Sequence, residues 1–301
     1  MRTLEYRALD EALTDLSRRV LEEGLEERPR GMGTTEITGC TFRLHDPRNR
    51  EVHLMSRRWS PSYAIGELCW HWSGSDDLET IAYYADRWRE CSDDGLRVPS
   101  SSYGKKIFGD GERSAWNRII HALRQDPSSR RAVLVLAERS DELGLNHKDV
   151  ACLTTIQFLI RQGKLHCITT ARSNDLILGL PYDVYFSTMT QERLALELEL
   201  ELGWYQHTCA SLHIYNQNKE LAWAIAGEDS SSGSNPMPPM TGLDAVDDFL
   251  SAERAIRLGM ADSLLHVSTL PTYWQALLQP VLRRALKRGA LPDVQVTSLT
   301  Q

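Results

Sequence analysis

The residues best suited to chemistry follow one another in the middle of the sequence. Cys152 supplies a thiol in a polar stretch that runs into a predicted strand, and nearby positive charge holds such a thiol as the nucleophilic thiolate. The adjacent arginines Arg130 and Arg131 precede this cysteine, the second by 21 residues, and Arg172 stands 20 residues after it. Guanidinium groups bind phosphate through paired N–H donors. Together these residues indicate a nucleophile next to a phosphate site.

Donors for a sugar come next along the chain. Ser173 follows Arg172 directly, and His213 and Tyr215 alternate on one face of a predicted strand. Hydroxyl and imidazole groups form hydrogen bonds with sugar hydroxyls. Each feature alone has an ordinary alternative: Cys152 as a small core residue, the arginines as solvated strand ends. Only the combination indicates a nucleotide site.

Asp183 stands in the stretch RSNDLILGLPYDVY, residues 172–185, in which a Gly-Leu-Pro turn precedes an aromatic–acid pair. An ionised carboxylate only accepts hydrogen bonds, so a binding role for Asp183 requires a ligand that presents donors. The alternative is a structural aspartate that caps the turn after Pro181, a common use of this residue type.

Length and composition are those of an ordinary soluble protein. The 301 residues are 42% hydrophobic and 25% charged, and the net charge of −7 offers no basic field for a nucleic-acid backbone. The charged N-terminus is unlike a signal peptide, and no stretch approaches the roughly 18 apolar residues of a membrane helix. Six cysteines without CxxC spacing predict reduced thiols, a cytoplasmic location and no metal site.

The elements that must position these residues have the periodicities of an α+β fold. Helical spacing marks residues 5–25, 60–74, 79–91, 115–125 and 187–202. Strand patterns mark residues 130–138 and a hairpin over 153–172 that turns at Gln162 and Gly163. The Gly/Ser/Pro-rich segment 227–242 predicts an exposed, flexible loop. No repeat or linker divides the chain, which predicts one domain over residues 1–301.

Taken in order, these motifs resemble those of the thymidylate synthase family, including its pyrimidine hydroxymethylase branch. The resemblance runs from about residue 30 to about residue 220 and follows RR, the cysteine, RSxD, GLP and HIY at consistent spacing. It implies a single thymidylate synthase-like domain with a large mixed β-sheet flanked by helices. It also implies a homodimer in which the sheets of two subunits pack back to back.

The resemblance assigns catalytic roles to four residues. Cys152 matches the nucleophile that adds to pyrimidine C6. Glu67, in IGELCW, matches the glutamate that orders water and moves protons around the base; without the pattern it would be an exposed helix carboxylate. Tyr103 matches a tyrosine beside the reacting carbons. Asp183 takes the position that faces the base.

The remaining matches bind the nucleotide. Arg172 and Ser173 resemble phosphate ligands of the same subunit, and Arg130 and Arg131 resemble arginines that the partner subunit donates. Either Arg28 or Arg30 fills the place of an N-terminal phosphate arginine, and we favour Arg30. The others match residues of the pterin and base pocket, the Gly-Leu-Pro turn and the sugar site: Asp175, Gly179, His213 and Tyr215.

At Asp183 the family members that act on uracil nucleotides carry asparagine, and the cytidylate hydroxymethylases carry aspartate. Uracil presents one acceptor and one donor, which an amide matches. When a thiolate adds to C6 of cytosine, N3 gains a proton and the edge presents two donors, which a carboxylate accepts as charge develops. A carboxylate against uracil O4 leaves a pairing unmet, at about 1–3 kcal/mol. Asp183 therefore predicts cytosine.

The expected reaction begins with attack of Cys152 on C6, which makes C5 a carbon nucleophile. C5 then takes the one-carbon unit of 5,10-methylenetetrahydrofolate, the cosubstrate. A synthase reduces the resulting exocyclic methylene by hydride, whereas a hydroxymethylase adds water to it. The sequence departs from the synthase pattern at three places: Leu153 in place of histidine, Ser211 in place of aspartate, and a C-terminus, DVQVTSLTQ, without the apolar synthase tail. A differently built C-terminal lid agrees with water addition.

The sequence predicts a cytidylate 5-hydroxymethylase that acts on CMP or dCMP. Its rivals are reductive methylation, hydroxymethylation of a uracil nucleotide, and a non-catalytic nucleotide- or RNA-binding protein. The sequence leaves the sugar open, and the purpose as well: modified cytosine enters viral DNA or begins the biosynthesis of a nucleoside antibiotic.

Overall fold

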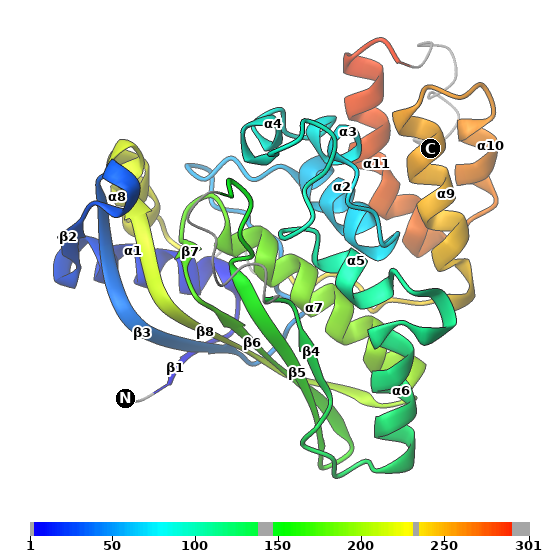
Figure 1. Cartoon of the computed structure of the whole chain (residues 1–301), viewed down its shortest axis with the longest axis horizontal. Coiled ribbons are helices and arrows are strands. Elements are labelled where there is room, and N and C mark those ends of the chain that lie inside the picture. The colour runs from blue at the N-terminus through cyan, green and yellow to red at the C-terminus, as the bar shows by residue number, and fades with distance from the viewer. Residues whose placement is uncertain (1–2, 138–146, 231–234, 291–301) are drawn as a thin grey trace. The chain divides into compact units, whose positions relative to one another are not determined.

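The computed structural model describes residues 3–137, 147–230 and 235–290 (Figure 1). These residues group into two compact units. The first unit contains residues 1–59, 115–142 and 151–238, and the second contains residues 60–114, 143–150 and 239–301. The chain therefore passes between the units several times. The single domain expected from the sequence stays a prediction.

The first unit is built on an eight-stranded mixed sheet of order β1-β3-β8-β6-β5-β4, in which β2 pairs with β3 and β7 with β8 (Figure 1). Its strands are β1 (Leu4–Tyr6), β2 (Leu25–Glu27), β3 (Thr34–Leu44), β4 (Val133–Val135), β5 (Leu153–Arg161), β6 (Lys164–Ala171), β7 (Asn174–Asp175) and β8 (Glu201–Tyr215). Its helices are α1 (Leu9–Glu23), α6 (Ala115–Gln125), α7 (Leu180–Glu197) and α8 (Lys219–Gly227). The expected α+β class with a large mixed sheet is confirmed.

The predicted hairpin is present and brings its two open ends together. β5 and β6 pair antiparallel from Leu153 opposite Ala171 to Arg161 opposite Lys164, and the turn residue Gln162 has a φ of 53°. A left-handed conformation is what a tight turn between two strands demands. As a consequence, the residue before β5 and the residue after β6 are neighbours.

The sequence pattern predicted a helix that starts at residue 187. The structure instead has helix α7 from Leu180 to Glu197. Pro181 stands in its first turn, where a missing N–H is harmless and the fixed φ favours a helix. The Gly-Leu-Pro segment is thus a helix start and not a free turn. It places Asp183 in the first turn of α7.

The second unit is helical in its described part. It contains α2 (Pro61–Trp72), α3 (Leu78–Ala82), α4 (Trp88–Cys91), α5 (Tyr103–Phe108), α9 (Val246–Arg257), α10 (Ser263–Ser268) and α11 (Thr272–Lys287). Residues 63–72 of α2 are all buried, with α11 and α9 against them. The single helix expected over residues 79–91 was wrong, because α3 and α4 are separate.

The Gly/Ser/Pro-rich segment is only partly the exposed loop that was expected. Helix α8 extends to Gly227, and Met237 and Met240 are 5% and 1% exposed. Residues 231–234 lie outside the described residues, as do Glu138 of the expected strand and the C-terminal stretch 291–301. In the described part of the chain, no helix has both the length and the apolar character that a bilayer crossing requires.

Candidate active site

Cys152 and Arg172 lie side by side at the open end of the β5–β6 hairpin. The backbone N–H of Arg172 donates to the carbonyl oxygen of Cys152 at 2.9 Å. The guanidinium lies over the same residue, with Nη2 at 3.8 Å from the sulfur and Nε donating to the carbonyl oxygen of Ala151 at 2.8 Å. A cation at this distance favours the thiolate. The hairpin therefore assembles a nucleophile and an anion-binding group.

The environment of Cys152 differs from that of the buried cysteines. Burial raises the pKa of the Cys40 thiol to about 11 and that of Cys209 to about 12, and it also raises the pKa values of Cys69 and Cys167. Such thiols are inert core residues. Cys152 is partly exposed, and it carries a thiol rather than a disulfide. Exposure and a neighbouring guanidinium together favour it as the nucleophile.

The sugar-binding candidates form a second cluster at the end of β8. Ser173 Oγ lies 3.4 Å from His213 Nδ1, and the rings of His213 and Tyr215 meet edge to face with centroids 5.1 Å apart. The guanidinium of Arg30 is close enough to Tyr215 to act on the pKa of its phenol. Burial raises the pKa of Tyr215, which Arg30 opposes. The phenol therefore remains a hydrogen-bond donor at neutral pH.

Arg30 has a φ of 54°, a left-handed conformation that costs a non-glycine residue strain. The segment Pro29–Gly31 forms a single 3-10 turn that leads into β3. Strain of this kind persists where the surroundings determine the conformation, and here the electrostatic interaction of the guanidinium with the Tyr215 phenol is one such contact. This contact favours Arg30 over Arg28 as the N-terminal arginine of the site.

Asp183 is bound by a residue that the sequence analysis did not single out. Asn174 Nδ2 donates to Asp183 Oδ2 at 2.8 Å, and Asn174 is only 2% exposed. Strand β7 holds Asn174, and the turn after it brings α7 back past the same side chain, with the N–H of Gly179 bonded to the carbonyl oxygen of Asp175 at 3.1 Å. The only signal in the sequence is the asparagine directly after Arg-Ser.

The electrostatics of Asp183 are unusual for an aspartate. Burial raises the pKa of its carboxyl to about 7, and the hydrogen bond from Asn174 opposes that rise. The residue nevertheless retains some exposed surface, so a ligand has access to it. A carboxyl group with this pKa is present in both protonation states at neutral pH and exchanges protons readily. The hydrogen bond that the structure gives the Asp183 side chain is with Asn174 and not with a backbone N–H of the turn, so it does not support a turn-capping role.

Asp175 stabilises the turn that leads to α7. Its Oδ1 accepts from the backbone N–H groups of Ile177 and Leu178 at 2.9 and 3.0 Å. The pterin-pocket role that was expected from the resemblance stays a prediction. Gly179 is the residue before α7, where an added Cβ would lie 3.4 Å from Asn174 Nδ2. The turn therefore fixes the approach of Asn174 to Asp183.

Arg130 and Arg131 lie in the segment that leads into β4, and both are exposed. Their backbone is fixed, because the side-chain amide of Gln157 donates to the carbonyl oxygen of Arg130 at 2.9 Å and Ser129 Oγ accepts from the N–H of Arg131 at 3.2 Å. Exposure agrees with donation to a partner subunit. That donation stays a prediction.

Glu67 and Tyr103 belong to the second unit, so their approach to Cys152 also stays a prediction. Glu67 is 8% exposed on α2 and accepts a hydrogen bond at Oε1 from the hydroxyl of Tyr63 at 2.5 Å. Tyr103 begins α5 and stacks on His71, with ring centroids 5.2 Å apart. Burial lowers the pKa of His71 to about 3, which keeps this imidazole neutral. Both candidates are thus held by buried aromatic neighbours.

Ser211 departs from the aspartate of the synthase pattern, and the structure shows a carboxylate beside it. Ser211 Oγ donates to Glu36 Oε2 of the neighbouring strand β3, and Glu36 is directly opposite His213 in the sheet register. Directly opposed residues share a face. Glu36, on β3, therefore places a carboxylate next to Ser211 and His213, where the synthase pattern has an aspartate on the same strand as the histidine.

Comparison with known proteins agrees with these motifs. Residues 11–232 match the family model described as thymidylate synthase. The chain belongs to the thymidylate synthase family. It is 29% identical over 278 residues to the deoxyuridylate hydroxymethyltransferase of Pseudomonas phage M6, covering 91% of this chain and 74% of that protein. It is 30% identical over 281 residues to the protein of the same name from Bacillus phage SP01, covering 83% and 72%.

A solved structure supports the fold of this thymidylate synthase family member. The thermostable thymidylate synthase A from Bacillus subtilis superposes with a TM-score of 0.61 and 23% sequence identity, covering 74% of this chain and 85% of that one. At that identity the match shows a thymidylate synthase-like fold. The expected resemblance and fold class are therefore confirmed.

Proposed function

We propose that this family member is a cytidylate 5-hydroxymethylase. It transfers a one-carbon unit from 5,10-methylenetetrahydrofolate to C5 of CMP or dCMP and adds water, which yields the 5-hydroxymethyl nucleotide and tetrahydrofolate. The names of the two phage relatives favour hydroxymethylation over reductive methylation. The observation that carries the choice of cytosine is the Asp183 carboxyl, partly exposed and bound by Asn174.

The first step uses Cys152 and Asp183 together. The thiolate of Cys152, beside the Arg172 guanidinium, forms a bond to C6 of cytosine, and the electron pair of the C5–C6 double bond is drawn toward N3. N3 takes a proton from Asp183, whose pKa of about 7 suits such a donor. Asp183 is then ionised and accepts hydrogen bonds from N3–H and from the N4 amino group. These bonds strengthen as the adduct forms, which is the condition for catalysis.

The phosphate and sugar are assigned to charged and polar groups of the first unit. Arg172, Ser173 and Arg30 receive the phosphate, and His213 and Tyr215 bind the sugar hydroxyl. Arg130 and Arg131 complete the phosphate site from the partner subunit of a homodimer. Supporting observations are the exposed guanidiniums and the contacts between Ser173 and His213 and between Arg30 and Tyr215.

C5 forms a bond to the methylene carbon of methylenetetrahydrofolate. Loss of the C5 proton and cleavage of the bond from that carbon to the folate nitrogen then release tetrahydrofolate and leave an exocyclic methylene group on C5. Glu67 then holds the water that adds to this methylene carbon, and Tyr103 lies beside the reacting carbons. Addition of water moves the electron pair of the exocyclic double bond into the ring, and re-formation of the C5–C6 double bond expels the Cys152 thiolate. No hydride is consumed, so no dihydrofolate forms.

Hydroxymethylation of a uracil nucleotide is the second candidate, and two observations favour it. Both relatives are named for deoxyuridylate. In addition, the neutral form of Asp183 carries one donor and one acceptor, as an asparagine does, so it matches uracil O4 and N3–H. The ionised form lacks the donor for O4. Only the reaction itself distinguishes the two bases.

Incubation with methylenetetrahydrofolate and CMP, dCMP, UMP or dUMP tests the proposal. Nucleotide mass is followed by mass spectrometry and dihydrofolate by absorbance near 340 nm. We expect a gain of CH2O on a cytosine nucleotide without a dihydrofolate signal, and the relative rates identify the sugar. A gain on uracil nucleotides alone selects the second candidate. A gain of CH2 together with dihydrofolate makes the protein a synthase, and unchanged nucleotides indicate a binding role.

A further inference from the structure

Two aromatic residues of the second unit form a hydrogen-bond chain that ends on Glu67. Tyr63 and Glu67 are one helical turn apart on α2, and the Tyr63 hydroxyl donates to Glu67 Oε1 at 2.5 Å. Trp88, on α4, donates its Nε1 hydrogen to the same tyrosine oxygen at 3.0 Å. Tyr63 is 5% exposed. The chain therefore runs from the partly exposed Trp88 through the buried Tyr63 to the buried Glu67.

The direction of this chain is fixed by chemistry. An indole nitrogen only donates, so the Tyr63 oxygen must be the acceptor of the Trp88 bond. The single hydroxyl hydrogen of Tyr63 is then left for Glu67. Burial and the negative charge of Glu67 raise the pKa of Tyr63 further above its ordinary value, so the phenol keeps that hydrogen. Glu67 Oε1 is consequently always an acceptor.

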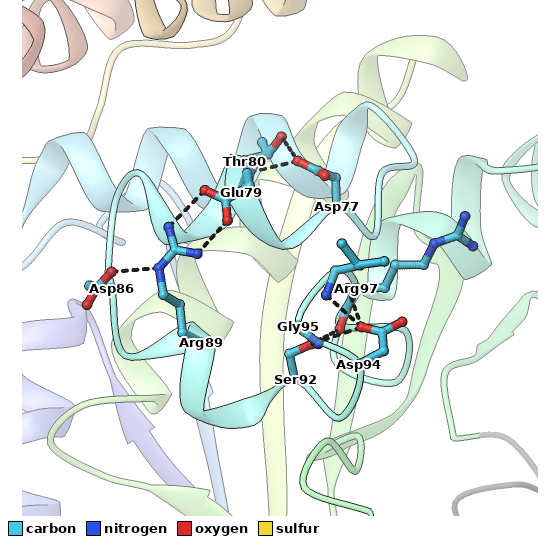
Figure 2. A network of polar contacts seen from close by, with 10 residues as sticks. Asp77, Glu79, Thr80, Asp86, Arg89, Ser92, Asp94, Gly95 and Arg97 are labelled. Carbon is cyan, nitrogen blue, oxygen red and sulfur yellow. Dashed lines mark hydrogen bonds and ion pairs between the residues drawn. The ribbon is translucent and has the colours of Figure 1, made fainter.

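Neighbouring residues also hold the Trp88 side chain in place, although α4 has only four residues. Its ring packs against Trp70 with centroids 5.6 Å apart, and Trp70 Nε1 donates to the carbonyl oxygen of Asp77 at 3.1 Å. The residue after Trp88 is Arg89, whose guanidinium binds Asp86 at 2.8 Å and both carboxylate oxygens of Glu79 (Figure 2). Asp77 in turn caps α3 by accepting from Thr80 (Figure 2). These contacts tie α4 to α3 and restrict the indole.

We infer that Tyr63 and Trp88 are positioning residues that hold the Glu67 carboxylate through Oε1 in the orientation from which it takes a proton from the attacking water. The inference rests on the proposed hydroxymethylase reaction. In that step the water oxygen forms a bond to the exocyclic methylene carbon, one water proton moves to the Glu67 carboxylate, and the electron pair of the exocyclic double bond moves into the ring. Expulsion of the Cys152 thiolate then restores the aromatic base. Tyr63 holds Oε1, so the carboxylate cannot rotate away from this geometry without losing a bond.

Replacement of Tyr63 by phenylalanine tests the inference, because it removes the hydroxyl and keeps the ring. The matched control is Tyr84→Phe: Tyr84 is 4% exposed in the same unit and donates to the carboxylate of Glu253 at 2.5 Å. Each substitution removes one buried hydroxyl bonded to a glutamate, and only the first touches Glu67. Trp88→Phe is a second variant that keeps an aromatic ring against Trp70 and removes the N–H.

We expect Tyr63→Phe to lower kcat for hydroxymethylation roughly 10- to 100-fold, with KM for the nucleotide unchanged. The loss is smaller than the roughly 100- to 10,000-fold that a general base contributes, because Glu67 itself is retained. The acidic limb of the kcat profile moves to higher pH, because a carboxylate without its donor protonates more easily. An added small thiol captures the exocyclic methylene more often, which mass spectrometry detects as a thioether of the nucleotide. Trp88→Phe changes all three readouts in the same direction by less, and Tyr84→Phe leaves them within about twofold.

An unaltered rate and pH profile for Tyr63→Phe, in a wild-type protein that hydroxymethylates, overturns this inference and leaves the proposed function intact. Equal losses for Tyr63→Phe and Tyr84→Phe with an unshifted pH profile also overturn it, since the cause is then general loss of packing. A wild-type protein that yields only a methylated nucleotide overturns the proposed function instead. Thermal unfolding of each variant establishes that it is folded before the rates are compared.

Discussion

At the scale of single residues, the base preference depends on whether position 183 provides a proton or an amide hydrogen. We expect Asp183→Asn to lower kcat/KM for cytosine nucleotides and to raise it for uracil nucleotides, because an amide matches O4 and N3–H and cannot transfer a proton to N3. Leaving one edge of the base unmatched costs about 1–3 kcal/mol, or roughly 10- to 100-fold in rate. Steady-state kinetics with all four nucleotides measure the change. An unchanged preference would show that another residue selects the base.

The same residue predicts a pH dependence of stability. The carboxyl of Asp183 has a pKa of about 7 in the folded protein and an ordinary value near 3.8 when unfolded. Between these two pH values the folded protein binds a proton at Asp183 that the unfolded protein does not. Proton binding at this carboxyl therefore contributes fully to the free energy of unfolding below about pH 4, and the contribution is lost as pH rises through 7. Asp183→Asn removes this titration. Denaturant unfolding should show wild type losing stability relative to the variant between about pH 4 and pH 7, and a constant difference would contradict the raised pKa.

Sequence patterns predicted that Cys152 and Arg172 lie together, because the two residues flank one hairpin. The arginine after the β5–β6 hairpin had to return to Cys152, since antiparallel pairing closes the hairpin at that end. Asn174 was missed because its partner Asp183 is nine residues away, across a turn whose geometry no periodicity encodes. Tyr63 was missed for a different reason. It is a buried aromatic residue on a buried helix, and in the sequence such a residue cannot be distinguished from one that only packs in the core; its hydrogen bond to Glu67 is visible only in the structure.

At the scale of elements, periodic segments were predicted well and irregular ones poorly. Helix α1 at Leu9–Glu23 lies inside the expected range of residues 5–25, because its apolar stripe is regular. The start of α7 was placed too late, since Gly-Leu-Pro was interpreted as a turn although proline suits a first helical turn. Residues 79–91 look helical throughout, yet the structure has two separate helices there, α3 and α4. Propensity alone does not reveal such a division.

Helix α2 should tolerate no enlargement where it carries Glu67. A Cβ added at Gly66 would lie 2.3 Å from ring atoms of Tyr84, and forced overpacking of a core costs about 1–3 kcal/mol. We therefore expect Gly66→Ala to lower the free energy of unfolding and, by displacing the neighbouring Glu67, the turnover number. The control is Gly227→Ala at the end of α8, where an added Cβ meets nothing within 4 Å. Chemical denaturation compares the two variants, and equal stabilities would contradict the close packing described here.

At the scale of the whole molecule, the first unit presents surfaces that suit association with a second copy. Along β8, the buried residues Tyr205, His207 and Cys209 alternate with partly exposed residues at positions 204, 206 and 208. One face of this strand therefore keeps side chains accessible, as back-to-back packing of two sheets requires. Arg130 and Arg131 are exposed as well. An isologous dimer would bring each pair of arginines to the other subunit.

Mixing of two inactive variants tests this arrangement directly. Cys152→Ala removes the nucleophile, and the double substitution Arg130→Ala and Arg131→Ala removes the donated guanidiniums, so each homodimer should be nearly inactive. After denaturation and refolding together, half of the dimers are hybrids, and each hybrid holds one site with both Cys152 and the arginines. Activity should then return to about a quarter of the wild-type value. If the arginines served their own subunit, no site in the hybrids would be complete and the mixture would stay inactive.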